Sequence, residues 1–209
     1  IPSYLKMALL ATEDRQFYQH VGVNLKTILR AVIKNILAGE FVEGASTITQ
    51  QLAKTLFLTP RKTLVRKLRE ALLAFQLERR YTKDEILTFY LNQVYFGSGA
   101  YGVESAARIF FGKSVKVLNL AECALIAGMP KSPSRYSPLV NPDLAVKRRN
   151  IVLRQMADTG IITPAVYREA SAELLPSMGR TSQTSRAPYF VEYIRKQLEE
   201  IVGPARLYK

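Results

Sequence analysis

The sequence predicts a mainly α-helical fold, and three observations lead to that prediction. Apolar residues recur at helical spacing in segment after segment of the 209-residue chain. Many of these segments open with a residue pattern that is typical of helix starts. Runs that alternate apolar and polar residues, as half-buried strands do, are missing beyond short pieces. A chain of this length, with 48% hydrophobic residues, can form a buried core as one large domain or two small ones.

Five helices are predicted in the first half of the chain. Thr47 and Gln50 have the spacing of a capping box, which satisfies free N–H groups at a helix start, and so do Thr82 and Glu85. Thr59-Pro60 places an N-cap before a proline at the first helical position. The predicted helices cover residues 1–14, 25–39, 47–58, 60–80 and 83–93, with a loop at 39–44.

The second half of the chain begins its helices in the same way. Asn119 and Glu122 have capping-box spacing, and Asn141-Pro142 and Thr163-Pro164 combine an N-cap with proline. The segment between the first two of these helices, residues 129–142, holds four prolines and is predicted to be a loop. Of these three helices, the first is predicted to end near residue 128, the second to cover 142–158, and the third to start at 164. A polar linker is predicted at 176–188, and a last amphipathic helix at 189–202.

Charge and cysteine content limit the classes of function. Lysine and arginine number 30 against 17 aspartate and glutamate, so the partner is expected to be anionic: a nucleic acid, a membrane surface or a phosphorylated substrate. The single cysteine, Cys123, excludes an internal disulfide and is expected to be a buried, inert thiol. One cysteine and one histidine exclude a usual zinc site. No stretch approaches the ~20 apolar residues of a membrane span, no signal peptide is visible, and the start at Ile1-Pro2 suggests a piece of a longer protein.

Two stretches have both a functional and a structural interpretation. Residues 97–102, GSGAYG, match the G-x-G-x-x-G pattern of dinucleotide-binding loops, but no predicted strand precedes them, so a tight or flexible glycine loop is expected. The helix at 25–37 has an apolar face, and Lys26, Arg30 and Lys34 lie four residues apart on another face. It either packs on the core or lies in a membrane surface, and composition alone favours the core.

The fourth predicted helix is dense in charge. Lys62, Arg66 and Glu70 follow one another at four-residue spacing, and Lys67 lies three residues before Glu70. These residues either form solvated ion pairs, or, with Lys54 of the preceding helix, converge on a cleft and hold a pyrophosphate leaving group. The apolar residues of this helix are expected to face a core: Leu64, Leu68, Leu72 and Phe75.

The carboxylates near the N-terminus suggest chemistry only if a second element contributes. Glu13 and Asp14 are adjacent, so on a helix their side chains point about 100° apart and cannot both face one reacting atom. A catalytic pair must come from separate elements, and Glu70, among cations that keep it ionised, is the best-placed second carboxylate. The structural alternatives are a surface carboxylate for Glu13 and a hydrogen-bonded structural histidine for His20.

Five segments carry recognisable motifs in order along the chain. They are EDRQFYQHVG (13–22), GASTITQQLAK (44–54), RKLRE (66–70), ILTFYLNQVYFGSGAYGVESAA (86–107) and ALIAGMPKSPSRYSP (124–138). Together they resemble the peptidoglycan glycosyltransferase domain of the class A penicillin-binding proteins (glycosyltransferase family 51). The tail APYFVEYIRKQLEE resembles the segment that leads into the transpeptidase domain of the bifunctional members.

The resemblance implies a lysozyme-like helical lobe with a smaller, membrane-proximal jaw subdomain. The glycosyltransferase domain would span residues 1–175, with the jaw at about 23–45. Residues 176–209 would form the linker and helix that lead toward a missing transpeptidase domain. The domain would lie at the outer, periplasmic or extracellular face of the bacterial cytoplasmic membrane, which favours the membrane interpretation of residues 25–43.

The resemblance also implies an activity, the polymerisation of lipid II into glycan strands with release of undecaprenyl pyrophosphate. The inhibitor moenomycin would bind the same cleft, and nucleic acid would not be a partner. The displacement requires no cofactor and no bound metal, and stimulation by a divalent cation (Mg²⁺ or Mn²⁺) is left open. A lysozyme-like peptidoglycan hydrolase is the main alternative, because it also works beside a glutamate but needs no pyrophosphate clamp.

Residue roles follow from the motif positions. Glu13 matches the catalytic glutamate and would be the general base, and Glu70 matches the second essential glutamate. Lys62 stands where the family often has arginine, so it keeps the charge but lacks the bidentate fork. The implied substrate-binding residues are Asp14, Ser46, Thr47, Gln50, Gln51, Lys54, Lys62, Arg66, Lys67 and Asn92. Structural support is implied for Phe17, His20, Gly22 and Gly44, and Asp14 and Asn92 are also expected to help fix the cleft.

Overall fold

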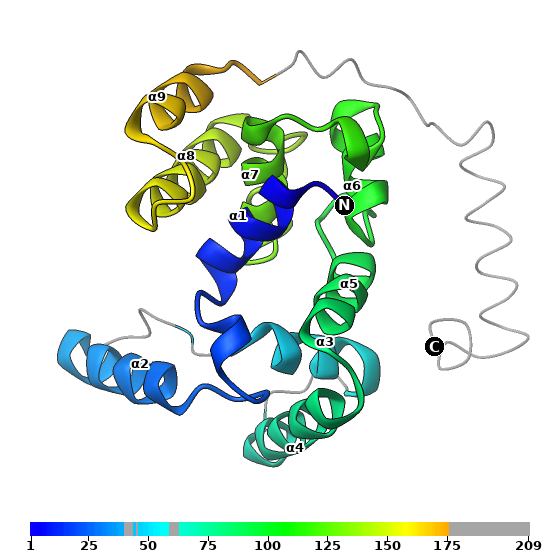
Figure 1. Cartoon of the computed structure of the whole chain (residues 1–209), viewed down its shortest axis with the longest axis vertical. Helices are drawn as coiled ribbons and strands as arrows, with labels where there is room; N and C mark the ends of the chain where they lie inside the picture. Colours follow the sequence, from blue (N-terminus) through cyan, green and yellow to red (C-terminus); the bar gives the residue numbers. More distant parts are fainter. Residues whose placement is uncertain (40–43, 45, 59–62, 176–209) are drawn as a thin grey trace, which may run out of the picture. The chain divides into compact units, whose positions relative to one another are not determined.

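The computed structural model describes residues 1–39, 44, 46–58 and 63–175, and within them helices and loops make up the fold (Figure 1). The mainly α prediction is confirmed. The chain divides by its internal contacts after Pro176, and the linker and helix predicted at 176–209 lie outside the described residues. The helices are α1 (Ser3–Glu13), η1 (Phe17–Gln19), α2 (Leu25–Ala38), α3 (Ile48–Phe57), α4 (Leu64–Arg80), α5 (Lys83–Gln93), α6 (Val103–Phe111), η2 (Val115–Val117), α7 (Leu120–Gly128), α8 (Pro142–Asp158) and α9 (Pro164–Ala172).

Local signals in the sequence set most of the helix starts. All three predicted capping boxes form, at the first turns of α3, α5 and α7. Thr63 caps α4 by accepting from the Arg66 N–H, and the start predicted at Thr59-Pro60 lies outside the described residues. Asn141 differs from the prediction, because its amide donates to the Arg135 carbonyl at 3.2 Å and makes no side-chain cap, although Pro142 does occupy the first turn of α8.

The core is centred on α7, which α1 and α8 cover, while α3 packs against α4 and α5 (Figure 1). Every residue of α7 from Ala121 to Gly128 is buried. A Cβ atom at Gly128 would lie 2.9 Å from the Arg148 side chain, so this glycine allows α8 to approach closely. Cys123 is a free thiol and is buried, as predicted, and burial raises its pKa to about 12.

The glycine-rich segment GSGAYG forms a tight loop that packs against a neighbouring loop. It follows α5, not a strand, and closes through hydrogen bonds between Phe96 N and Ala100 O and between Gly102 N and Val94 O. Gly97 has a φ of +92°, and a Cβ there would lie 2.6 Å from the Pro133 carbonyl oxygen. Glycine is therefore required at this position by both backbone conformation and packing. The rejection of a dinucleotide-binding loop agrees with this geometry.

Two helices turn apolar faces outward, and one of them overturns a prediction. The apolar residues of α4 that were expected to face a core are exposed, and Leu64 reaches 90%. The reason is that α4 buries its other face, with Glu70, Ala74 and Leu77, on the side from which α3 packs. In α2 the exposed apolar residues are Leu25, Leu29, Ile33, Ile36 and Leu37.

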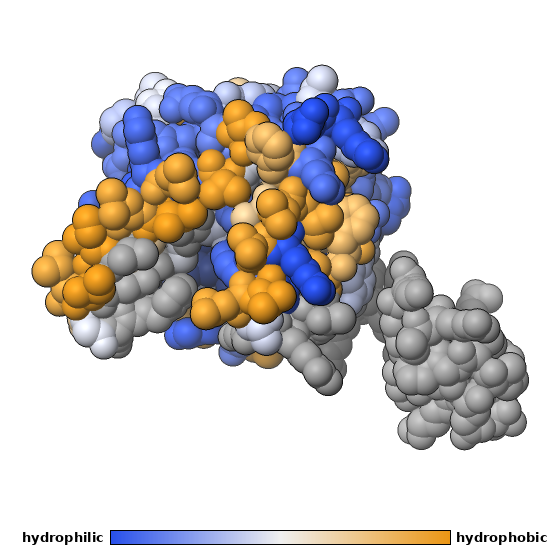
Figure 2. All heavy atoms as spheres, turned by 90° about the horizontal axis from the view of Figure 1, so that it is seen from below, coloured by the Kyte–Doolittle hydropathy of each residue, from blue (hydrophilic) through white to orange (hydrophobic). Residues whose placement is uncertain are grey.

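These exposed side chains gather on the lower side of the molecule. Figure 2 views that side from below, and hydrophobic side chains extend over much of it. We call this the lower apolar surface, defined by the exposed residues Leu25, Leu29, Ile33, Ile36 and Leu37 of α2, Leu56 and Phe57 of α3, and Leu64, Val65, Leu68, Leu72 and Phe75 of α4. Within the described part of the chain, every helix is too short or too polar to cross a membrane.

Candidate active site

A cleft of about 900 Å³ lies where the end of α1 meets α2, the start of α3 and α8. Two carboxylates line it, Glu13 and Asp14, which the sequence singled out. The predicted residues Gly44, Ser46, Thr47 and Gln51 line it as well. Its cationic lining was not predicted and consists of Arg15, Arg30, Lys34, Lys131 and Arg148.

Glu13 is the last residue of α1, and each of its carboxylate oxygens faces a polar partner. Gln51 of α3 donates an amide hydrogen bond to Oε2 at 3.0 Å. Arg148 of α8 places Nη2 4.0 Å from Oε1. The Glu13 side chain is only 12% exposed, so a positive charge and a hydrogen-bond donor act on it with little screening by water. Both partners hold the carboxylate at the wall of the cleft.

Gln51 is itself held by a buried tyrosine. The Tyr90 hydroxyl, on α5, donates to Gln51 Oε1 at 3.0 Å. Burial, together with the nearby Glu13 carboxylate, raises the pKa of Tyr90 well above its ordinary value. Tyr90 therefore keeps its proton throughout the physiological pH range and acts as a donor.

Arg148 is fixed by contacts with two helices, α1 and α7, and with the loop that follows α7. Its Nε donates to the Gly128 carbonyl at 2.9 Å, and its Nη2 donates to the Thr12 hydroxyl at 3.1 Å. The guanidinium also lies 5.7 Å from the centre of the Tyr136 ring. Burial lowers the pKa of Arg148, while the Glu13 charge opposes that shift. Arginine remains charged even so, and its planar group cannot rotate away without losing both hydrogen bonds.

Asp14 is the C-cap residue of α1 and has partners other than those of Glu13. Its Oδ2 accepts from His20 Nε2 at 2.9 Å and from the backbone N–H of Ile48 at 3.1 Å. The carboxylate therefore sits at the N-terminus of α3, where a negative charge is stabilised by free N–H groups and the helix dipole. Asp14 thus connects the first and second motifs. Glu13 is the other carboxylate that lines the cleft.

Thr47 and Gln50, which were expected to bind substrate, stabilise the start of α3. The two form the capping box of α3, and both are buried. The Thr47 hydroxyl also donates to the Gly22 carbonyl at 2.6 Å. Gly22 has a φ of +77°, and a Cβ there would lie 2.9 Å from the Ala74 backbone, so only glycine fits between η1 and α4.

A second cluster of charged residues surrounds Glu70. This carboxylate is 2% exposed and pairs with Lys67 Nζ at 2.5 Å and with Arg66 Nη1 at 3.6 Å. Lys67 also donates to the Ser46 hydroxyl at 2.7 Å, and its own side chain is 46% exposed. Ser46 lines the cleft, so it connects the Glu70 cluster with the space beside Glu13.

The other predicted residues lie at some distance from Glu13 or outside the described chain. Lys54 is exposed in the last turn of α3, and Asn92 is exposed near the end of α5; neither lines the cleft. Lys62 lies outside the described residues. Phe17 is buried beneath the ammonium group of Lys83, which lies 4.5 Å from the ring centre.

Sequence reasoning missed Tyr90, Arg148, Arg30, Lys34 and Lys131. The four-residue spacing of Lys26, Arg30 and Lys34 did reveal a basic face on the second helix, but nothing connected that face with Glu13. Tyr90 lies within the fourth motif but received no role, and Arg148 lies outside all five motifs. The contacts of both residues depend on how helices far apart in the sequence pack together.

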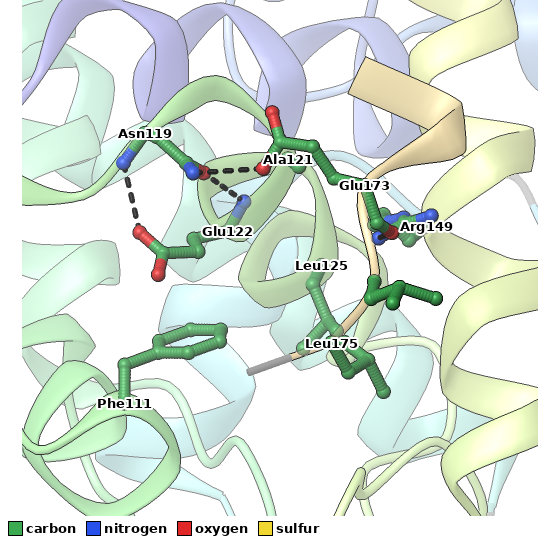
Figure 3. A pocket seen from close by; sticks show the side chains of 9 residues that line it. Phe111, Asn119, Ala121, Glu122, Leu125, Arg149, Glu173 and Leu175 are labelled. Atoms are coloured by element: carbon green, nitrogen blue, oxygen red, sulfur yellow. Dashed lines mark hydrogen bonds between the residues drawn. The ribbon is translucent and has the colours of Figure 1, made fainter. Parts of the chain in front are cut away.

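A smaller cavity, of about 170 Å³, lies on the other side of α7, and Figure 3 shows its lining. Its polar groups bind one another: Asn119 donates to Glu173 Oε2 at 2.9 Å, and Arg149 donates to the carbonyls of Ser171 and Glu173. These bonds fasten the chain after α9 to α7 and α8. The polar groups are thus occupied, and the cavity is small, so we do not assign it a substrate.

Among the described residues, no three His, Cys, Asp or Glu side chains gather closely enough to hold a metal ion. The positive charge that lines the cleft comes from lysine and arginine side chains.

Comparison with known proteins agrees with this arrangement. A family model described as transglycosylase matches residues 1–157. The chain is 48% identical to penicillin-binding protein 1A of Aquifex aeolicus, over 99% of this chain and 29% of that protein. It is 45% identical to penicillin-binding protein 1A of Escherichia coli, over 97% of this chain and 24% of that protein. The chain thus spans less than a third of the length of these curated relatives.

A solved structure is similar as well. The crystal structure of penicillin-binding protein 1A from Haemophilus influenzae aligns with a TM-score of 0.55 and 27% identity, over 98% of this chain and 20% of that one. The family resemblance inferred from the five motifs is confirmed by the match over residues 1–157 and by the identity with these relatives. The chain belongs to the transglycosylase family.

Proposed function

We propose that the protein is a peptidoglycan glycosyltransferase that polymerises lipid II into glycan strands. One observation carries this proposal: Glu13 presents a nearly buried carboxylate, held by Gln51 and Arg148, to a cleft of about 900 Å³. A sugar hydroxyl that enters such a cleft meets a base that is already oriented. Membership of the transglycosylase family supports the same activity.

The proposed reaction forms one bond and breaks one. The 4-hydroxyl oxygen of lipid II attacks the anomeric carbon of the growing glycan while Glu13 takes the hydroxyl proton. The bond from that carbon to the pyrophosphate oxygen breaks, and its electron pair leaves with undecaprenyl pyrophosphate, so the anomeric centre is inverted. A positioned general base typically contributes ~10²–10⁴-fold to the rate of such a step.

The Glu70 cluster is proposed to stabilise the leaving pyrophosphate. Lys67 has the part-exposed ammonium that could face a phosphate, and Glu70 and Ser46 fix its position. Glu70 is buried and already paired with two cations, so we assign it to orienting Lys67 and Arg66 and not to proton transfer. Preorganised cations stabilise a developing oxyanion without reorganisation. Lys54 and Lys62 are proposed to add to this charge, and no cofactor is then needed.

A lysozyme-like hydrolase is not favoured. Such an enzyme needs a second carboxylate across the sugar from the first. Of the two carboxylates that line the described cleft, Asp14 is taken up by His20 and by the N-terminus of α3. The family match also supports transfer over hydrolysis.

The lower apolar surface is proposed to rest on the outer face of the bacterial cytoplasmic membrane. Lipid II is anchored in that membrane, so an enzyme that docks there brings its cleft to the level of the pyrophosphate. The cationic residues Arg30 and Lys34 of α2 line the cleft, and the exposed leucines and isoleucines of the same helix form part of the lower apolar surface. This division of charged and apolar faces is typical of helices that lie in a membrane interface.

The first test is lipid II polymerisation in detergent, with wild type beside Glu13→Gln. The substitution keeps the size of the side chain and removes the base, so a loss of ~10²–10⁴-fold in turnover is expected. Binding of moenomycin, which we propose to occupy the same cleft, should be retained by Glu13→Gln. Glu169→Gln, at an exposed position of α9, is the matched control and should keep wild-type turnover.

Two results would contradict the proposal in different ways. Equal polymerisation by wild type and Glu13→Gln would remove Glu13 as the base. Wild type that releases soluble muropeptides from finished cell wall, and makes no glycan from lipid II, would favour the hydrolase.

A further inference from the structure

Tyr90 begins a series of two hydrogen bonds that ends at Glu13, the proposed base. Its side chain lies on α5 and is 2% exposed. Its hydroxyl donates to Gln51 Oε1, and Gln51 Nε2 donates to Glu13 Oε2, both at 3.0 Å. This series of hydrogen bonds therefore runs from α5 through α3 to the end of α1, and its last two members, Gln51 and Glu13, line the cleft.

The direction of these hydrogen bonds matters, because the two ends of an amide are not equivalent. Gln51 has an oxygen that only accepts and a nitrogen that only donates. While the Tyr90 hydroxyl donates to the oxygen, the nitrogen must face Glu13. If the amide turned over, its oxygen would face the carboxylate, and the contact would be favourable only if Glu13 were protonated.

The orientation of the Gln51 amide is thus coupled to the charge of Glu13. The orientation set by Tyr90 stabilises the ionised carboxylate, which is the form that can accept a proton from a sugar hydroxyl. Arg148 acts in the same direction on the other carboxylate oxygen, so the two partners reinforce each other. Burial keeps the Tyr90 proton in place, so the hydroxyl stays a donor to Gln51.

We propose that Tyr90 is a positioning residue for the glycosyl transfer, and that it acts by fixing the Gln51 amide so that Glu13 is held in its ionised, proton-accepting form. This inference rests on the proposed function, in which Glu13 is the base. It adds a residue that contacts no substrate and lies behind the cleft.

The test uses Tyr90→Phe, which removes the hydroxyl and keeps the buried ring. We expect kcat for lipid II polymerisation at neutral pH to fall by up to about tenfold, the order of one neutral hydrogen bond. KM should change little, and the acidic limb of the pH–rate profile should move to higher pH. Tyr167→Phe, at a part-buried tyrosine of α9, is the control and should leave kcat and the profile unchanged.

A double-mutant cycle with Gln51→Ala distinguishes positioning from a general effect on packing. If Tyr90 acts through Gln51, Tyr90→Phe has no further effect on kcat once Gln51 is alanine. An equal effect in both backgrounds would overturn the proposal, and so would wild-type kinetics of Tyr90→Phe. A Tyr90→Phe protein that failed to fold would overturn it too, because the hydroxyl would then serve the fold. If the wild-type protein did not polymerise lipid II, that result would contradict the proposed function itself.

Discussion

At the scale of single residues, the site depends on partners that surround one carboxylate. Glu13 is placed by the end of α1, but its environment is made by Gln51, Tyr90 and Arg148 from three other helices. Arg148 has the most contacts of these partners, with the Gly128 carbonyl, the Thr12 hydroxyl and the Tyr136 ring. Its role can be tested without removing its charge.

Arg148→Lys is expected to lower both activity and stability. A lysine keeps the positive charge but cannot reach Gly128 and Thr12 with a planar fork. Leaving the buried Gly128 carbonyl without its donor should cost about 1–3 kcal/mol in the free energy of unfolding. Turnover should fall most at low pH, because the charge beside Glu13 moves away. Urea unfolding and a pH–rate profile measure the two effects.

Arg154→Lys is the matched control for this experiment, since Arg154 lies on the same helix with its side chain in solvent. It should behave like wild type in both measurements. An Arg148→Lys protein with unchanged unfolding and an unchanged pH profile would show that Arg148 has no part in holding Glu13.

The residues that the sequence could predict are those whose role is local or carried by a motif. Glu13 and Gln51 belong to motifs, and the capping boxes at Thr47 and Thr82 depend on residues three positions apart. Tyr90 lies within the fourth motif, but the motif did not reveal its role, and Arg148 lies beyond all five motifs. Their contacts join residues 39 and 136 positions apart, so only the packed structure brings them together.

At the scale of helices, periodicity predicted which residues share a face but not what the face contacts. The apolar stripe of α4 is real, yet it points outward and not into the core. Hydrophobic spacing is the same whether a helix packs on protein or faces lipid. The helix α6 was missed although Val103, Ala106, Ala107 and Phe110 have helical spacing and Gly112 ends it in a left-handed conformation.

The lower apolar surface leads to a prediction about membrane binding. Leu68→Glu places a charge in the apolar stripe of α4, where the side chain is 64% exposed. Binding to vesicles of anionic phospholipid should fall, since a charge would have to enter the interface, and folding should be unaffected. Vesicle co-sedimentation measures the bound fraction.

Val117→Glu provides a control with equal exposure. Val117 is also 64% exposed, but it lies in η2, which packs against α6 and is not part of the lower apolar surface. Its substitution should leave vesicle binding unchanged. Equal loss of binding by Leu68→Glu and Val117→Glu would mean that binding depends on net charge and not on this surface.

At the scale of the whole molecule, stability should decline in alkaline solution. The pKa of Cys123 is raised by burial from 9.0 to about 12, and the pKa of Tyr90 is raised as well. Between pH 9.0 and about 12 the unfolded thiol loses its proton while the folded thiol keeps it. The unfolded state then binds fewer protons, so the free energy of unfolding falls as pH rises.

Urea unfolding at a series of pH values from 8 to 11 can test this. Wild type should show a falling free energy of unfolding above about pH 9, the ordinary range of a thiol. Cys123→Ala removes one titrating group. Its free energy of unfolding should therefore fall less steeply with pH than that of wild type, whatever its value at pH 8. Parallel curves for the two proteins would refute the assignment.

The contact between Thr12 and Arg148 has a consequence for how the protein is made. The two residues lie 136 positions apart, and α1 buries its apolar side against α7 and α8. A chain that emerges from the ribosome N-terminus first carries Glu13 long before Arg148 exists. All five motifs lie before residue 139. A chain that ended there would contain every motif but would lack Arg148, which holds Glu13 in place. Synthesis of α8 therefore completes the site.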